Sequence, residues 1–467
     1  MSKPLFLILP TLFLMSCQME TISPKSEDPI VEDEPDSAEP TVEASQTPLP
    51  ATPPPVTNPP TTTPIVGVVL KPDDNLAEIV ASKAEGTTFI LKAGTHKNQM
   101  IIPKKGQIFI GEKDSSGKLI TILSGENSTR YAFAGSASKV TIRNLIVEKY
   151  ADPAQHGAIG AHNQSGNPIT PAVEWIVEGN EVRYNAGGGI RVGPRSIVRG
   201  NSVHHNLQIG VTGYGADLLI ERNEIAYNNY THSYSAGWEA GGTKFWETTN
   251  AKLRCNYVHH NIGPGLWADN DNVGTLYEGN IVTDNDEMGI FHEISYAAVI
   301  RNNIVKRNGK GIYAGWDWKS WLYGSNILIS SSESAEIYKN IVEVGDFGNG
   351  IGVLQQSRGS GAFGPHLTKN NDVHHNRITF RNSSGRNGVV QDWNGSVVFT
   401  SNKFNWNAYH VANLNQAHFD WNNTQMKFSS LQTAGQEKNG TIDSVITLDK
   451  TTEAVPANCP NPLPDLF

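Results

Sequence analysis

Charged and aromatic residues recur at fixed places after a glycine and an apolar residue in the middle of the chain. If each such stretch is a short strand, its side chains alternate between two faces. The first outward position of successive strands then holds Arg191, Thr212, Lys244, Trp267, Phe291 and Tyr313. The second outward position holds Trp246, Asp269 and Glu293. Stacked strands would therefore place carboxylates, two cations and aromatic rings on one face.

Three kinds of chemistry fit these residues. Lys244 could remove a proton next to a carboxylate while Arg191 neutralises the developing charge. Asp269 and Glu293 lie on adjacent strands, about 4.8 Å apart, which suits a retaining glycosidase pair. The same carboxylates could bind a hard cation such as Ca²⁺, and their charge should hold Lys244 protonated. We expect this face to be solvent-accessible, with the rings of Trp246, Trp267, Phe291 and Tyr313 stacking on sugar faces. In the structural alternative, the aromatic row packs beneath a loop and the carboxylates are solvated turn residues.

The repeat contains one long step, from Asn223 to Asn256, which carries an insertion relative to its neighbours. Loops on a rigid scaffold commonly carry function. We therefore expect the insertion, with His232, Trp238 and Glu239, to emerge near this face and contribute substrate-binding residues.

Histidines also recur, but their positions favour structural roles. His292 falls at an inward position and is expected to be a hydrogen-bonded core residue. The pairs His204-His205, His259-His260 and His374-His375 recur in the frame of the repeat and are expected at corners.

The element that must position these residues is a repeat of 21 to 24 residues. Asn followed two positions later by Val or Ile occurs at Asn144, Asn180, Asn201, Asn223, Asn256, Asn280, Asn303, Asn340 and Asn376. A second Asn often follows five positions later, and then Gly and an apolar residue. Short β-branched strands between Gly and Asn turns predict a parallel β-helix, with Asn residues stacked at one corner and tolerating the left-handed conformation.

Both ends of the repeat carry capping signals. Asp73, Asp74 and Asn75 precede an apolar pattern over residues 76–80, which predicts a short capping helix before a first coil at 87–95. We expect one solenoid from about 65 to 450, followed by a tail over 451–467.

The stretch Gly86–Thr95 and the Asn-x-Val coils resemble the pectate-lyase-like right-handed parallel β-helix proteins, across roughly residues 65 to 410. Residues 428–440 resemble a closing segment of these proteins, and residues 239–246 with 291–295 resemble members without a settled activity. The resemblance implies an all-β solenoid and action on carbohydrates. It leaves open a polysaccharide lyase or C5-epimerase on uronates, a glycoside hydrolase, or a non-catalytic glycan-binding protein.

The first residues form a secretory signal, with Lys3, an apolar run from Leu5 to Met15, and then Ser16-Cys17. The ending resembles a bacterial lipobox, which implies cleavage before Cys17 and its acylation. Gln18 favours the outer membrane by analogy with lipoprotein sorting. We therefore expect an envelope protein that contacts the membrane only through its lipid.

Residues 17–64 are expected to be a disordered tether. From residue 18 onwards the segment holds 12 of the 26 prolines, nine Asp or Glu residues and one Lys. Subtracting the tether's −8 and the +1 of Lys3 from the net charge of −9 leaves about −2 for the body. No basic block favours nucleic acid, and we expect a monomer with a polysaccharide partner.

Two cysteines remain in the body, Cys255 and Cys459. An exported pair could form a disulfide. Because Cys255 immediately precedes a repeat Asn in a buried row, separate thiols are the favoured expectation.

Overall fold

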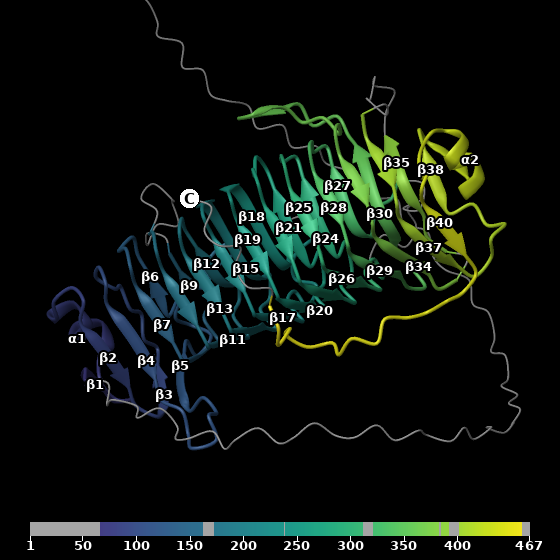
Figure 1. Ribbon diagram of the computed structural model, residues 1–467. Coiled ribbons are helices and arrows are strands. Elements are labelled where there is room, and N and C mark those ends of the chain that lie inside the picture. Colours follow the sequence, from purple (N-terminus) through teal and green to yellow (C-terminus); the bar gives the residue numbers. More distant parts are fainter. Residues whose placement is uncertain are drawn as a thin grey trace, which may run out of the picture. The chain divides into compact units, whose positions relative to one another are not determined.

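The computed structural model describes residues 66–161, 172–237, 239–311, 321–382, 384–391 and 401–459. Short strands in these ranges form stacked coils that run from α1 (Leu76–Ser82) to α2 (Phe428–Thr433) (Figure 1). Each regular coil contributes one strand to each of three sheets, and neighbouring coils pair in parallel. The molecule is an all-β, right-handed parallel β-helix, as the sequence predicts.

Sheet A contains β1 (Val68–Leu70), β2 (Thr88–Leu91), β4 (Ile108–Gly111), β7 (Thr141–Arg143), β10 (Ile176–Glu178), β13 (Ile197–Arg199), β16 (Leu219–Glu221), β19 (Lys252–Arg254), β22 (Leu276–Glu278), β25 (Val299–Arg301), β28 (Glu336–Tyr338), β33 (Asp372–His374) and β36 (Lys403–Asn405). Sheet B contains β3 (Gly94–Lys97), β5 (Thr121–Ser124), β8 (Ile146–Glu148), β11 (Glu181–Arg183), β14 (Ser202–His204), β17 (Glu224–Ala226), β20 (Tyr257–His259), β23 (Ile281–Thr283), β26 (Ile304–Lys306), β29 (Ile341–Val344), β34 (Arg377–Phe380), β37 (Ala408–Val411) and β40 (Thr441–Asp443).

Sheet C contains β6 (Phe133–Ala134), β9 (Gly157–Gly160), β12 (Gly188–Val192), β15 (Ile209–Ala216), β18 (Gly241–Thr249), β21 (Leu266–Asp269), β24 (Ile290–Glu293), β27 (Ser325–Ser330), β30 (Asn349–Gln355), β35 (Asn387–Gln391), β38 (Phe419–Trp421) and β39 (Thr424–Met426). A small antiparallel pair, β31 (Ser360–Gly361) and β32 (Gly364–Pro365), projects from the coils. The core is the inward face of all three sheets, filled mainly by Val, Ile, Leu and Phe.

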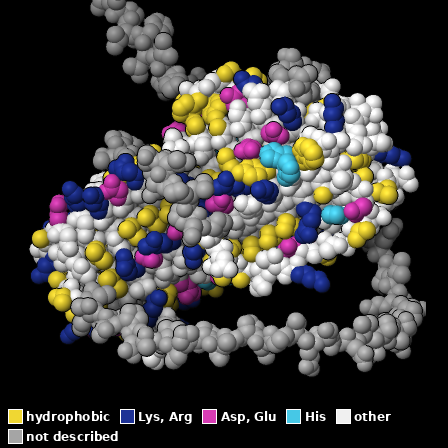
Figure 2. All heavy atoms as spheres, viewed as in Figure 1, with side chains coloured by type: hydrophobic (Ala, Val, Ile, Leu, Met, Phe, Trp, Pro, Cys, Tyr) yellow, Lys and Arg dark blue, Asp and Glu magenta, His cyan; other side chains and the backbone are white. Residues whose placement is uncertain are grey.

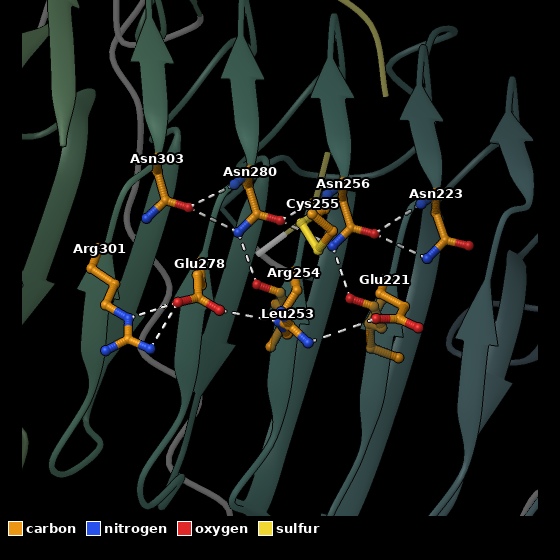
Figure 3. The surroundings of a disulfide bond; sticks show 12 residues. Glu221, Asn223, Leu253, Arg254, Cys255, Asn256, Glu278, Asn280, Arg301 and Asn303 are labelled. Carbon is orange, nitrogen blue, oxygen red and sulfur yellow. Dashed lines mark hydrogen bonds and ion pairs between the residues drawn. A yellow bond between two sulfur atoms is a disulfide. The ribbon is translucent and has the colours of Figure 1, made fainter. Parts of the chain in front are cut away.

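A ladder of buried asparagines holds the corner between sheets A and B (Figure 3). It contains Asn180, Asn201, Asn223, Asn256, Asn280 and Asn303, as predicted, and each Nδ2 donates to the next Oδ1 at 2.9 to 3.0 Å. Each side chain also donates to a strand carbonyl. A second ladder contains Asn185, Asn206, Asn228, Asn261, Asn285 and Asn308.

Two details of the predicted corner are wrong. The left-handed residue is the one before each ladder Asn, such as Gly179 at φ 64° or Cys255 at φ 52°. The ladder Asn instead turns its amide inward to bond along the stack. Asn144 lies one residue before the ladder position of its coil. The pairing of β8 with β11 puts Leu145 opposite Asn180, and the Asn180 Oδ1 accepts from the Leu145 backbone N–H.

The predicted N-terminal capping helix is confirmed, and the segment that resembles a closing segment contains a second helix. Helix α1 begins after Asn75, whose Oδ1 accepts from the Glu78 N–H at 3.4 Å, and it buries Leu76 and Val80. Helix α2 falls within the predicted closing segment and buries Phe428 and Leu431. The strand edges at both ends are thereby protected.

Residues 444–459, the C-terminal strap, run back along sheet B (Figure 1, yellow). Asp449 and Glu453 each lie 3.3 Å from Lys306, which the strap helps to bury. The strap ends in a disulfide between Cys459 and the fully buried Cys255 (Figure 3). The expectation of separate thiols is therefore wrong. That expectation rested on the buried position of Cys255 alone. The repeat gives no sign that the C-terminal strap runs back to Cys255.

Charges of both signs are interspersed on the face in Figure 2. On sheet A this mixture is ordered, since Glu278 bonds to Arg254 at 3.2 Å and to Arg301 at 2.8 Å on either side (Figure 3). No helix in the described ranges is long and apolar enough to cross a membrane.

Candidate active site

The first predicted row is present on the outward face of sheet C. Arg191 pairs with Thr212, Thr212 with Lys244, and, further along, Trp267 with Phe291. The next place is taken by Leu328 of β27, where the sequence predicted Tyr313. The Gly-apolar pair at 311–312 was expected to begin the sheet C strand of this coil. That strand, β27, begins at Ser325 instead. Tyr313 itself lies outside the described residues.

The second predicted row is also present. Asp269 pairs with Glu293, and the alignment of Phe245 with Ala268 puts Trp246 beside Asp269. The row extends one coil further than predicted, since Tyr214 pairs with Trp246 and their rings stack with centroids 5.3 Å apart.

Only part of this face is open. A cleft of about 560 Å³, the main cleft, is lined by Gln155, His156, Arg191, Gln208, Ile209, Thr212, Glu239, Lys244, Trp246, Asp269, Asn270 and Ile294. A cavity of this size matches small-molecule sites in general. The insertion contributes Glu239 as expected, whereas Trp238 lies outside the described residues.

Lys244 occupies the floor of the main cleft between two carboxylates. Its Nζ lies 2.7 Å from Glu239 and 2.8 Å from Asp269, and 3.8 Å from the centroid of the Trp267 ring. Burial lowers the pKa of Lys244, but the charges of Asp269 and Glu239 outweigh that effect and hold the pKa above its ordinary value. The expectation that Lys244 stays protonated is supported, so it suits charge stabilisation better than proton removal.

Arg191 is the second cation of the cleft and is only 6% exposed. Its Nη1 donates to the Gln155 carbonyl at 2.7 Å, and its guanidinium lies 5.1 Å from the Trp246 ring centroid. Within the described part of the chain no carboxylate pairs with it, its Nε has no partner, and burial lowers its pKa. A buried guanidinium of this kind is costly unless an anion joins it.

Other polar atoms around the main cleft also lack protein partners among the described residues. They are Gln208 Nε2, Tyr214 Oη and Asp269 Oδ1. Buried polar atoms are nearly always hydrogen-bonded, and exceptions concentrate at sites that bind water or ligands. These atoms are therefore available to hydrogen-bond water or a ligand in the cleft.

Sequence reasoning missed His156, which lines the same cleft. Its Nδ1 lies 3.2 Å from Oδ1 of the buried Asp152, and that carboxylate also accepts from Arg130 at 2.9 Å. An imidazole oriented by a carboxylate is a common arrangement for proton transfer. The local signal is the Asp152-to-His156 spacing just before β9, in a coil without the ladder Asn that defined the repeat.

The remaining predicted residues are covered. Trp267 and Phe291 stack 5.5 Å apart, but they pack beneath a cluster that includes Leu322 and are only 3% and 4% exposed. The expectation of one solvent-accessible face is therefore wrong here, because Leu322 packs with both rings in one buried cluster and the rings line a smaller cavity instead of the main cleft. For these two rings the structural alternative is correct.

Glu293 lies in this covered part, beside a smaller cavity of about 200 Å³. It accepts from Trp267 Nε1 at 3.2 Å and forms an ion pair with Arg358. Burial and the charge of Asp269 raise the pKa of Glu293 despite Arg358. Asp269 and Glu293 are adjacent, as predicted, but they face different cavities.

The two carboxylates expected to bind Ca²⁺ are each paired with a cation. Lys244 contacts Asp269 Oδ2 and Arg358 contacts Glu293 Oε1, so one oxygen of each carboxylate is already engaged. No group of three His, Cys, Asp or Glu in the described ranges has the arrangement of a metal site.

The histidines lie where the sequence places them. His292 is fully buried, and burial lowers its pKa to about 3. The three histidine pairs lie at the ends of β14, β20 and β33, and within each pair the Nδ1 atoms lie 2.8 to 2.9 Å apart. None of these residues lines the main cleft.

Comparisons with known proteins agree with this architecture. Residues 157–327 match the family model described as right handed beta helix region. The A-module of mannuronan C-5 epimerase AlgE6 from Azotobacter vinelandii is 15% identical, with a TM-score of 0.50 over 80% of this chain and 94% of that chain. XylC in complex with xylose is 12% identical, with a TM-score of 0.52 over 80% and 83%. No curated protein matches the chain.

These observations define the class: the chain is a right-handed parallel β-helix protein. At such identities the likeness to solved structures establishes the fold alone.

Proposed function

We propose that this protein is a carbohydrate-active enzyme, a lyase or C5-epimerase that acts on uronate polysaccharides in the main cleft. The observation that carries the proposal is the buried Arg191, which faces the cleft without a carboxylate partner in the described residues. A uronate carboxylate would supply the missing anion, and a guanidinium binds it through two parallel hydrogen bonds.

The reaction would begin at the carbon next to that carboxylate. His156, oriented by Asp152, takes the C5 proton, and the electron pair left behind spreads into the carboxylate. Arg191 and the protonated Lys244 stabilise the resulting charge. In a lyase the electron pair then expels O4, which receives the proton from His156. In an epimerase C5 instead takes a proton from solvent water on the opposite face, and His156 releases its proton to solvent.

The Trp246 and Tyr214 rings and the unpaired polar atoms would hold the sugar. Trp246 lines the main cleft and remains partly exposed, unlike Trp267. Its stacking on Tyr214 fixes the ring, so little conformational entropy is lost when a sugar binds against it.

A glycoside hydrolase is the second proposal, because the raised pKa of Glu293 beside Asp269 resembles an acid and nucleophile pair. Two contacts weigh against it. Arg358 pairs with Glu293, and the two carboxylates line separate cavities.

The test is to incubate the full mature chain with uronate and neutral polysaccharides and to assay unsaturated ends, reducing ends and C5 configuration. Unsaturated ends or inversion with uronates alone supports the proposal. Arg191→Ala should lower activity by roughly 100- to 1,000-fold, as loss of one charge-stabilising donor does. Arg191→Lys should lower it less, and the exposed Arg381→Ala serves as a control.

Reducing ends without unsaturation would identify a hydrolase. Binding without any product would identify a non-catalytic glycan-binding protein. Either result would refute the proposed chemistry.

We also propose that the protein is attached to the cell envelope through an acylated Cys17, with residues 18–64 as the tether. These residues lie outside the described ranges, and the support is the sequence pattern alone. Mass spectrometry of the mature amino terminus should show a lipid-modified Cys17. An unmodified terminus further along the chain would refute this proposal.

A further inference from the structure

A second cleft, the corner cleft, lies away from sheet C at the corner that joins sheets A and B. It measures about 430 Å³ and is lined by Lys113, Arg143, Asn144, Glu178, Gly179, Arg199, Gly200 and Arg222. Four of these residues directly follow β7, β10, β13 and β16, so stacked turns form its floor. Lys113 enters from a separate hairpin-like turn.

The corner cleft has an excess of positive charge. Four cations meet one carboxylate, Glu178, which lies 3.0 Å from Arg199 and 3.7 Å from Arg143. In the portion of the chain that the structure describes, Lys113 and Arg222 have no carboxylate partner. This excess contrasts with a body whose expected net charge is about −2.

The charge row of sheet A explains why the excess arises here. Further along, each Glu lies between two Arg residues, as Glu278 does in Figure 3. Arg143 is the first charged residue of this row. In the preceding strand, β4, the paired position holds the apolar Ile110. Arg143 therefore has a carboxylate on one side only, and its buried Nε has no hydrogen-bond partner in the described residues.

The shape of the corner cleft leaves room for more than a bare ion. Gly200 has φ 61°, and a Cβ built on it would meet nothing within 4 Å. Two neighbouring turns, at Gly179 and Gly200, thus lack side chains and leave the floor open. The volume falls in the range of roughly 300 to 1,000 Å³ that is typical of small-molecule sites.

We infer that the corner cleft binds a sulfate ester carried by a glycan. Arginine matches the tetrahedral oxygens of such a group through paired N–H donors. The open glycine floor would hold the sugar ring that carries the anion. This inference does not depend on the chemistry of the main cleft, which faces a different sheet.

The experiment measures binding of a sulfated disaccharide that contains no uronate to the full mature chain by calorimetry. The same disaccharide without sulfate and inorganic sulfate are the comparison probes. Lys113→Ala/Arg222→Ala should weaken binding of the sulfated disaccharide at least about tenfold, because two charge-assisted contacts are lost. Neither residue has a side-chain partner in the described chain, so the fold should persist, which circular dichroism checks.

Lys403→Ala/Arg381→Ala removes the same charge from exposed positions on later coils and should leave the affinity unchanged. Arg191→Ala should also leave it unchanged, which separates this site from the main cleft. Equal binding of the unsulfated sugar, equal binding of inorganic sulfate, or no binding would each overturn the inference. An equal loss in both double variants would show only a general charge effect and would overturn it too.

Discussion

The ladder corner and the main cleft are built by overlapping sets of coils, yet they follow opposite rules. At the corner every coil from Asn180 to Asn303 repeats the same residue, and each amide bonds to the next. In the main cleft neighbouring coils offer Arg191, Thr212 and then Lys244 at equivalent places. Where the same residue repeats in every coil, at the corner, the side-chain hydrogen bonds are satisfied. Where the residue changes from coil to coil, in the main cleft, some buried polar atoms have no partner among the described residues.

The difference has an energetic side. A buried polar atom without a partner costs roughly 1 to 3 kcal/mol, whereas a paired one stabilises the fold modestly. The ladders and the apolar core can therefore offset the unpaired atoms at the main cleft. Strain and unmet bonding of this kind are typical of functional sites.

The largest expected effect comes from breaking the ladder. Asn256→Ala removes the acceptor for Asn223 and the donor to the Ile220 carbonyl, so buried groups lose their partners. We expect the free energy of unfolding to fall by about 4 kcal/mol. Denaturant titration measures it.

The exposed Asn439→Ala is the matched control and should change stability by less than about 0.5 kcal/mol. Equal effects of the two substitutions would show that the ladder contributes nothing special.

A somewhat smaller effect is expected when the strap is released. Cys255→Ser/Cys459→Ser opens a disulfide that joins residues 204 apart in sequence. We expect a loss of about 3 kcal/mol, because long loops gain most from crosslinking. Thermal unfolding measures it, and reductant should lower the Tm of the wild type but not of the variant. An unchanged Tm in both cases would show that the ion pairs to Lys306 suffice.

The smallest expected effect is a pH dependence at Glu293. Its pKa is raised in the folded state, so the folded protein binds more protons than the unfolded chain above about pH 4. Stability linked to Glu293 is therefore present at low pH and is lost as the pH rises through the folded pKa. Glu293→Gln should flatten this slope in denaturant titrations above about pH 4. An unchanged slope would contradict the burial of this carboxyl.

The sequence predicts those parts of the molecule that stacking determines. Identical residues one coil apart must align, so the ladder, the two rows on sheet C and the inward His292 follow from spacing. The same logic fails where a coil breaks the pattern, as at Asn144.

Features that depend on segments outside the coils could not be read from the repeat. Leu322 lies in the connection just before β27, and the strap with Cys459 returns from a distant part of the chain. His156 precedes the regular repeat, so spacing gave it no place on the face. These segments decide which residues of a predicted row remain open.

The most direct test of the account concerns Arg191 and the carboxylate it would bind. The affinity of the full mature chain for a uronate oligosaccharide should be compared with that for its methyl ester, in the wild type and in Arg191→Ala. The wild type should prefer the free acid at least about tenfold, since a charge-assisted pair contributes about 1.5 to 3 kcal/mol. Arg191→Ala should bind both forms equally weakly. An undiminished preference for the free acid in Arg191→Ala would contradict the central claim that this buried cation recognises the substrate's carboxylate.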